Sequence, residues 1–220
     1  MQNTENTSRD CDITRVLKCI ASGKPFDMNL NGPSPEGREY IKCIIKEYLK
    51  QVGKEKFYNL VCLCMEEIIS NSVKANVKRA YFIENNLDIN NHNDYEIGMK
   101  NFREQGIANC KDREFINKIL FMGFYIKVTF KIENDIFYII TRNNSVISQE
   151  ELVRINKRLA LFENKSPEEI FVNSIDTTEG AGLGIIMIKK IMSQVSTLPD
   201  CFSISANEIE TITQLKISRN

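Results

Sequence analysis

The sequence predicts an α+β fold in which helices pack on a mixed, mainly antiparallel sheet as a two-layer sandwich. Apolar residues recur with helical period over residues 38–52 and again through the stretch that follows. Alternating β-branched and aromatic residues then occupy residues 124–141, and the chain ends in two more extended runs. Helices and strands are thus grouped rather than alternating, which argues against βαβ units and favours the sandwich.

The first 53 residues read as an extension that precedes the main domain. Residues 1–36 are polar and rich in turn formers, with a short extended candidate at 25–30. A helix is predicted at 38–52, and Gly53 ends it. We therefore expect residues 1–53 to form an N-terminal extension with one helix, followed by a domain at 54–220.

Within that domain the pattern predicts a long helix, a helical insertion and a hairpin. The long helix buries Leu60, Val61, Cys64, Ile68 and Ile69 on one face. Residues 84–110 are Asn-rich and polar, and a short helix is expected near 113–122, so that about 84–122 forms a helical insertion. The two strands of the hairpin are joined around residues 134–135.

The last third of the chain contains two helix-start signals and a glycine run. Ser148 and Glu151 form a capping box that opens one helix, and Ser166 followed by Pro167 opens a short second one. Polar residues 173–180 then lead to EGAGLG at 179–184, which opens a helix at 185–195. Strands are predicted at 202–206 and 211–217.

Composition indicates a cytoplasmic protein without affinity for nucleic acid or membranes. Lys and Arg number 29, as do Asp and Glu, so no net field draws the protein to a polyanion. No apolar run reaches the length of a membrane span. Seven cysteines, mostly inside apolar helical patterns, are typical of a reducing compartment.

Two segments carry candidate functional groups. Glu67, Asn71 and Lys74 lie at spacings of four and seven, which brings an acid, a carboxamide and a cation to one side of a helix. The glycine run opens another helix, whose free N–H groups favour phosphate. Together these parts suit Mg-ATP. Taken singly, each has a plainer reading: a solvated helix face, and a tight loop chosen for backbone geometry.

The order and spacing of these segments resemble the ATP-binding domain of the GHKL superfamily, which includes histidine kinases and anti-sigma-factor kinases. EIISNSVKAN at 67–76 resembles the N box and EGAGLGIIMIKKI at 179–191 the second glycine box, within a resemblance that spans about 57–217. The resemblance implies a two-layer α/β sandwich of the Bergerat type, with ATP and Mg²⁺ as ligands.

The resemblance also implies roles for individual residues. Glu67 matches the N-box acid beside the γ-phosphate, Asn71 the amide that coordinates Mg²⁺, and Lys74 the cation that reaches the phosphates. The loop that would wrap the phosphates is represented by Gly180, Gly182, Leu183 and Gly184.

The adenine-reading box departs from the superfamily pattern. Where the superfamily has Asp-x-Gly-x-Gly, this chain has TRNNSVIS at 141–148. The favoured register places Asn143 on the Asp, Asn144 on the adjacent Asn and Ser145 on the first Gly, with one residue deleted; a register with Arg142 on the Asp remains open. In the favoured register Asn143 offers a neutral acceptor to adenine, weaker by roughly 1 kcal/mol or more, and restoring Asp is expected to tighten ATP binding.

The resemblance implies a stand-alone signalling kinase or regulator that acts on a protein partner or phosphoacceptor, and it is compatible with a homodimer. The alternative is a degenerate, non-catalytic GHKL interaction module, which the lost Asp favours. A gyrase-like clamp is disfavoured because the chain has no room for a transducer domain. The single histidine, His92, lies in an Asn-rich loop after the N box, so phosphate is expected to go to a separate protein.

Overall fold

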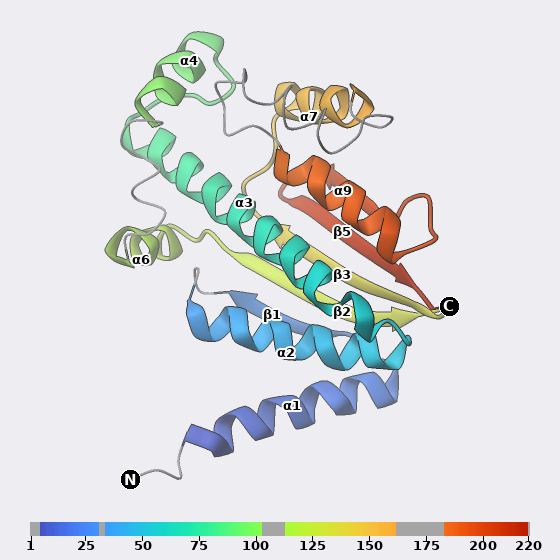
Figure 1. Cartoon of the computed structure of the whole chain (residues 1–220). Coiled ribbons are helices and arrows are strands. Elements are labelled where there is room, and N and C mark those ends of the chain that lie inside the picture. Colours follow the sequence, from blue (N-terminus) through green and yellow to red (C-terminus); the bar gives the residue numbers. More distant parts are fainter. Residues whose placement is uncertain (1–4, 31–33, 103–112, 162–182, 220) are drawn as a thin grey trace.

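The computed structural model describes residues 5–30, 34–102, 113–161 and 183–219 (Figure 1). The helices are α1 (Glu5–Ser22), α2 (Pro35–Gln51), the short 3₁₀ helix η1 (Glu55–Phe57), α3 (Tyr58–Glu84), α4 (His92–Asn101), α6 (Arg113–Phe121), α7 (Gln149–Leu161) and α9 (Leu183–Val195). The strands are β1 (Phe26–Leu30), β2 (Ile126–Glu133), β3 (Ile136–Asn143), β4 (Phe202–Ala206) and β5 (Thr211–Ser218).

The five strands form one sheet in the order β1-β2-β3-β5-β4. Every pair among these described strands is antiparallel, so the mixed sheet expected from the sequence is corrected to an antiparallel one. The tight connection between β2 and β3 explains part of this order. Asn134 and Asp135 both have positive φ, at 50° and 60°, which suits a two-residue hairpin turn and confirms the predicted hairpin.

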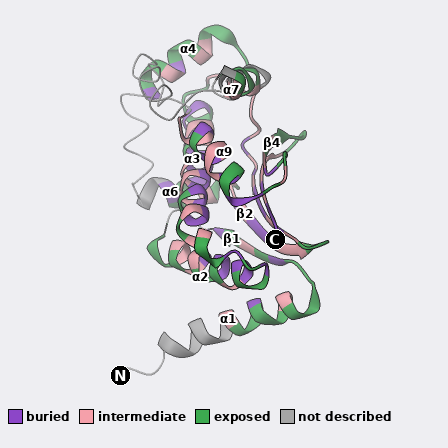
Figure 2. Ribbon diagram, turned by 45° about the vertical axis from the view of Figure 1, so that its right-hand side comes forward, coloured by how far each residue is buried: buried purple, intermediate pink, exposed green. Residues whose placement is uncertain are grey.

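Helices α2, α3 and α9 lie on one face of the sheet (Figures 1 and 2). One continuous cluster of buried apolar side chains joins the helices to the sheet. Within it the Tyr48 ring stacks on Phe137 of β3, with ring centroids 4.8 Å apart, and its hydroxyl donates to the Phe130 carbonyl oxygen at 3.2 Å. The α+β prediction is confirmed, and the arrangement is compatible with a two-layer sandwich.

The expectation of one helix in residues 1–53 is wrong, because this region contains two helices, α1 and α2. The sequence of α1 is rich in polar residues with modest helix propensity, so local pattern did not reveal it. Packing on the core stabilises α1 instead: Val16 is fully buried, and Cys19 and Ile20 pack on the same core. The extended candidate at 25–30 is confirmed as β1, which pairs with β2 at the edge of the sheet.

The helix-facing side of the sheet changes character along the strands. At one end it is apolar, with Phe130, Phe137 and Leu215 all at 0 % exposure. At the other end Thr141 is paired with Thr213, and Asn143 with Thr211. Thr141 and Asn143 are nevertheless buried, at 2 % and 4 % exposure. Burying polar groups costs free energy unless they are hydrogen-bonded, so this polar end is where a site is to be sought.

Candidate functional site

Helices α3 and α9 lie close together at Glu67 and Gly184. A Cβ atom at position 184 would lie 2.6 Å from the Glu67 Cγ and nearer still to the carboxyl group. No real side chain makes such a contact, so glycine is required here unless Glu67 moves. The structure therefore brings the predicted acid of the N box against the last residue of the glycine run.

The other candidate residues on these two helices are placed less tightly. Asn71 is half-buried and Lys74 is exposed, one and two turns along α3 from Glu67 on the same side of the helix. Leu183 and Gly184 begin α9. Gly180, Gly182, the polar connector at 173–180 and the helix predicted after Ser166 lie outside the described residues.

Asn143, the last residue of β3, belongs to a buried network of polar side chains at the polar end of the sheet. Its Nδ2 donates to the Ser145 carbonyl oxygen at 3.3 Å and to Asn76 Oδ1 at 3.5 Å. Ser145 Oγ donates to the same Asn76 oxygen at 2.7 Å, and Thr211 Oγ1 donates to the Ser145 carbonyl oxygen at 2.8 Å. Asn76, Asn143 and Ser145 are all 4–5 % exposed, so the network links α3 to β3 within the interior.

The carboxamide of Asn144 has a different set of partners. Its Nδ2 donates to the Gly123 carbonyl oxygen at 2.9 Å, and its Oδ1 accepts from the Tyr125 N–H at 2.9 Å. Both ends of the amide therefore hold the connection between α6 and β2. These contacts assign Asn144 a structural role beside the nucleotide-binding role predicted from its position.

Helix α3 also holds the segment that follows β3. Arg79 donates to the Val146 carbonyl oxygen, and Lys78 forms an ion pair with Glu151 of α7. Burial acts to raise the pKa of Glu151, but the charge of Lys78 and the hydrogen bonds from Lys78 and the Ser148 N–H outweigh it, so the pKa is lowered. Burial lowers the pKa of the Arg79 guanidinium.

The capping box predicted at the start of α7 is present. Ser148 Oγ accepts from the Glu151 N–H at 3.2 Å, and Glu151 Oε2 accepts from the Ser148 N–H at 3.0 Å. Glu151 thus caps α7 with one oxygen and pairs with α3 through the other. The segment at 145–151 that follows β3 is therefore attached to α3 on both sides of Ser148.

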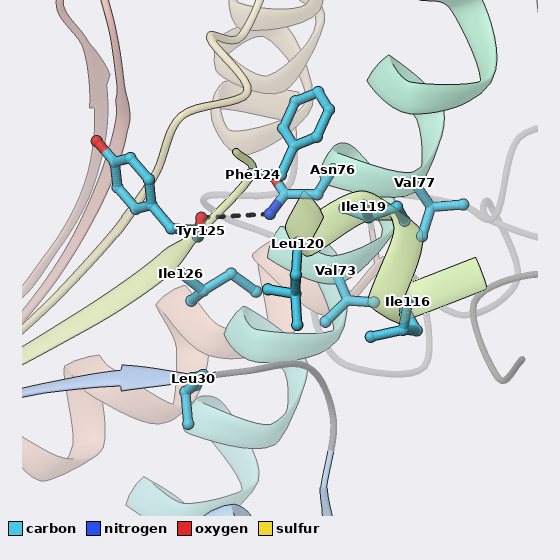
Figure 3. A pocket seen from close by; sticks show the side chains of 10 residues that line it. All are labelled: Leu30, Val73, Asn76, Val77, Ile116, Ile119, Leu120, Phe124, Tyr125 and Ile126. Carbon is cyan, nitrogen blue, oxygen red and sulfur yellow. Dashed lines mark hydrogen bonds between the residues drawn. The ribbon is translucent and has the colours of Figure 1, made fainter. Parts of the chain in front are cut away.

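A small apolar pocket lies on the side of α3 that faces α6 and β2 (Figure 3). Val73, Ile116, Ile119 and Phe124 line it, and Asn76 stands at its edge, where its Nδ2 donates to the Tyr125 carbonyl oxygen at 3.2 Å. The free volume is about 20 Å³, room for about one water molecule. The pocket is too small for a nucleotide, and we assign it no function.

Sequence reasoning missed three residues of this region: Asn76, Lys78 and Arg79. One signal was available for Asn76. It occupies the apolar face of α3, between Val73 and Ala80, where a carboxamide is expected only if it has a buried partner. No comparable signal existed for Lys78 or Arg79, because their partners lie more than sixty residues away in the sequence.

The described residues contain no group of three or more His, Cys, Asp or Glu side chains that could hold a metal ion. Cys62 and Cys64 are buried in the core, and burial raises the pKa of Cys64 to about 12. Among the helices that the structure describes, none is long and apolar enough to cross a membrane.

None of the known protein-family models matches this chain. The chain is similar to a protein of Treponema pallidum (strain Nichols), described as an uncharacterized protein, with 31 % identity over 219 residues. The match covers 99 % of this chain and 40 % of that relative. The chain therefore spans less than half the length of the relative it matches.

Proposed function

We propose that this chain is a GHKL-type nucleotide-binding protein with a Bergerat-type sandwich, and that it binds Mg-ATP between α3, α9 and the polar end of the sheet. The contact between Glu67 and Gly184 carries the proposal. It joins the acid of the N-box-like helix to the glycine run that opens α9, although the two positions are more than a hundred residues apart. The buried polar network at Asn143 lies at the end of β3, which contacts the same helix α3.

The residues of α3 and α9 suit the parts of such a ligand. The Asn71 carboxamide oxygen is a hard ligand of the kind that Mg²⁺ prefers, and Mg²⁺ would complete its shell with water and phosphate oxygens. The exposed ammonium of Lys74 has the reach to meet a phosphate. The first N–H groups of α9 have no partner within the helix and favour an anion.

The activity we propose is that of a signalling kinase or regulator acting on a separate protein. Bound Mg-ATP would supply the transferable γ-phosphoryl group. Glu67 would accept the proton of the attacking hydroxyl group or nitrogen at its carboxylate. The expectation that His92 lies in a loop is wrong, because it is the first residue of helix α4, where its side chain is 73 % exposed. Such an exposed side chain has no fixed in-line geometry to a γ-phosphate, so the proposed phosphoacceptor remains a separate protein.

A second candidate is a non-catalytic interaction module that keeps the fold. The carboxamides at 143 and 144 favour it, because their hydrogen bonds among the described residues serve the protein itself. If the protein had lost nucleotide binding, we would expect these carboxamides to form hydrogen bonds within the protein instead of with a nucleotide.

Titration of the purified protein with ATP, with and without Mg²⁺, tests the proposal. We expect saturable binding that weakens when Mg²⁺ is removed, and Asn71→Ala should abolish that dependence on the metal. Asn93→Ala, on the exposed first turn of α4, is the matched control. Absence of ATP binding by the wild-type protein would leave the interaction module as the better reading.

A further inference from the structure

We infer that Asn76 and Ser145 are positioning residues that orient the Asn143 carboxamide, so that its oxygen is presented to a nucleobase carrying an exocyclic amine. This inference rests on the proposed nucleotide site and adds to it the base selectivity and the residues that set it.

The orientation of each amide follows from backbone carbonyl groups, which can only accept. Asn76 donates through Nδ2 to the Tyr125 carbonyl oxygen at 3.2 Å, so its Oδ1 must face the other way, where Ser145 Oγ donates to it at 2.7 Å. The Asn143 Nδ2 atom lies 3.5 Å from that same Asn76 Oδ1 and 3.3 Å from the Ser145 carbonyl oxygen. Two acceptors face the Asn143 amide on this side, so the group turned toward them is the NH₂.

Further hydrogen bonds hold the acceptors themselves in place. The Ser145 carbonyl oxygen also accepts from Thr211 Oγ1 at 2.8 Å, and Thr211 Oγ1 in turn accepts from the Ile147 N–H at 2.8 Å. Thr211 is the cross-strand partner of Asn143. A flip of the Asn143 amide would set its oxygen against two carbonyl-type oxygens in a buried site, which is strongly unfavourable.

With Nδ2 turned toward these acceptors, Oδ1 is the polar atom of the Asn143 side chain left for a ligand, which must reach it past the residues that keep Asn143 at 4 % exposure. Among the described residues, both side-chain hydrogen bonds of Asn143 use Nδ2 and neither uses Oδ1. A lone acceptor pairs with an amine donor, as on adenine, and repels a carbonyl oxygen, as at position 6 of hypoxanthine. The orientation therefore selects ATP over inosine triphosphate.

The same geometry explains why Asp would not serve at this position. A carboxylate has no NH₂, so one oxygen would face the Ser145 carbonyl oxygen and Asn76 Oδ1 at the distances now held by Nδ2. Like-signed partial charges in a buried site are costly. The gain from a charged acceptor, expected from the sequence, is then offset by repulsion from Asn76, and Asn143 and Asn76 form a matched pair.

The test compares the binding of ATP and inosine triphosphate to purified protein by calorimetry with Mg²⁺ present. We expect the wild type to prefer ATP about tenfold, the equivalent of one hydrogen bond. Asn76→Ala should reduce that ratio to about twofold. Asn85→Ala is the matched control, because its Nδ2 also donates to a backbone carbonyl oxygen, that of Tyr81 at 2.8 Å, but outside the network.

A second experiment measures the effect of Asn76→Ala on ATP affinity in the Asn143→Asp background, where we expect the opposite sign. In the Asn143→Asp background, Asn76→Ala removes the repulsive oxygen and should raise ATP affinity, whereas in the wild-type background it lowers it. In the first experiment, Ser145→Ala, which removes the hydroxyl that donates to Asn76 Oδ1, replaces Asn76→Ala if that variant does not fold.

The outcomes separate this inference from the proposed function. Equal binding of ATP and inosine triphosphate by the wild type would overturn the inference while leaving a nucleotide site. An unchanged ratio in a folded Asn76→Ala or Ser145→Ala variant would overturn the positioning role. Failure to bind either nucleotide would remove the proposed function and this inference with it.

Discussion

The side chain of Glu67 occupies the space beside Gly184 where a Cβ atom would otherwise lie, with 2.6 Å between that position and the Glu67 Cγ. The contact makes the two positions dependent on each other. It also leaves two roles open for Gly184, close packing of α3 on α9 and access of phosphate to the start of α9, and these can be separated by mutation.

Gly184→Ala should destabilise the protein because the new methyl group overlaps the Glu67 side chain. Because the overlapped atoms belong to the flexible end of a half-buried side chain that can shift, we expect a loss of about 1 kcal/mol in the free energy of unfolding, at the low end of the range for overpacking. Glu67→Ala should relieve that loss, so the double variant should unfold near the Glu67→Ala single variant. Denaturant unfolding of the four proteins measures the coupling, and additive losses would refute the direct contact.

Glu67→Gln should separate nucleotide binding from chemistry. The amide has nearly the shape of the carboxylate but cannot accept a proton, so ATP affinity should change only a few-fold while phosphotransfer or hydrolysis stops. Measurements of ATP affinity and of turnover with a candidate partner test this together. If the variant keeps the turnover of the wild type, Glu67 is not the general base.

Lys78 and Glu151 should stabilise the attachment of α7 to α3 in a pH-dependent way. Their side chains are 16 % and 15 % exposed, so loss of one partner should cost about 2 kcal/mol near neutral pH. The folded-state pKa of Glu151 is lowered from 4.5, so its contribution is present above the unfolded value and is lost as pH falls through the folded one.

Thermal unfolding of Glu151→Gln and the wild type between about pH 7 and pH 3 measures this dependence, and the two curves should converge at the acid end. Glu133→Gln is the matched control, because Glu133 pairs with Lys131 but its side chain is 56 % exposed. A constant difference between Glu151→Gln and wild type across this range would show that the ion pair contributes nothing to the effect.

His92→Ala should leave any phosphotransfer unchanged. His92 is the first residue of α4, and its nearest charged partner is Glu96 one turn on, with 3.7 Å between Nε2 and Oε1. An exposed side chain there has no fixed in-line geometry to a γ-phosphate. Incubation with labelled ATP checks this; an acid-labile label on the protein that disappears in His92→Ala would establish self-phosphorylation.

Some features were determined by the sequence itself, because they depend on neighbours in the chain. The Asn134–Asp135 turn, the capping box of Ser148 and Glu151, and the helix that follows the glycine run each arise from residues a few positions apart. Helical periodicity was likewise sufficient to predict α2 and the apolar face of α3. Glu67 and the glycine run could likewise be proposed as candidate site residues from the sequence, because each belongs to a local pattern of residues close together in the chain.

Only the tertiary structure decided which distant residues meet. Helix α1 has weak propensity and forms because Val16 finds a buried position. The network of Asn76, Asn143, Ser145 and Thr211 joins a helix, a strand end, a turn and a second strand, and no local pattern encodes those pairings. Buried polar groups acquire partners only when the chain folds, so the orientation of Asn143 was decided by packing and not by its own identity.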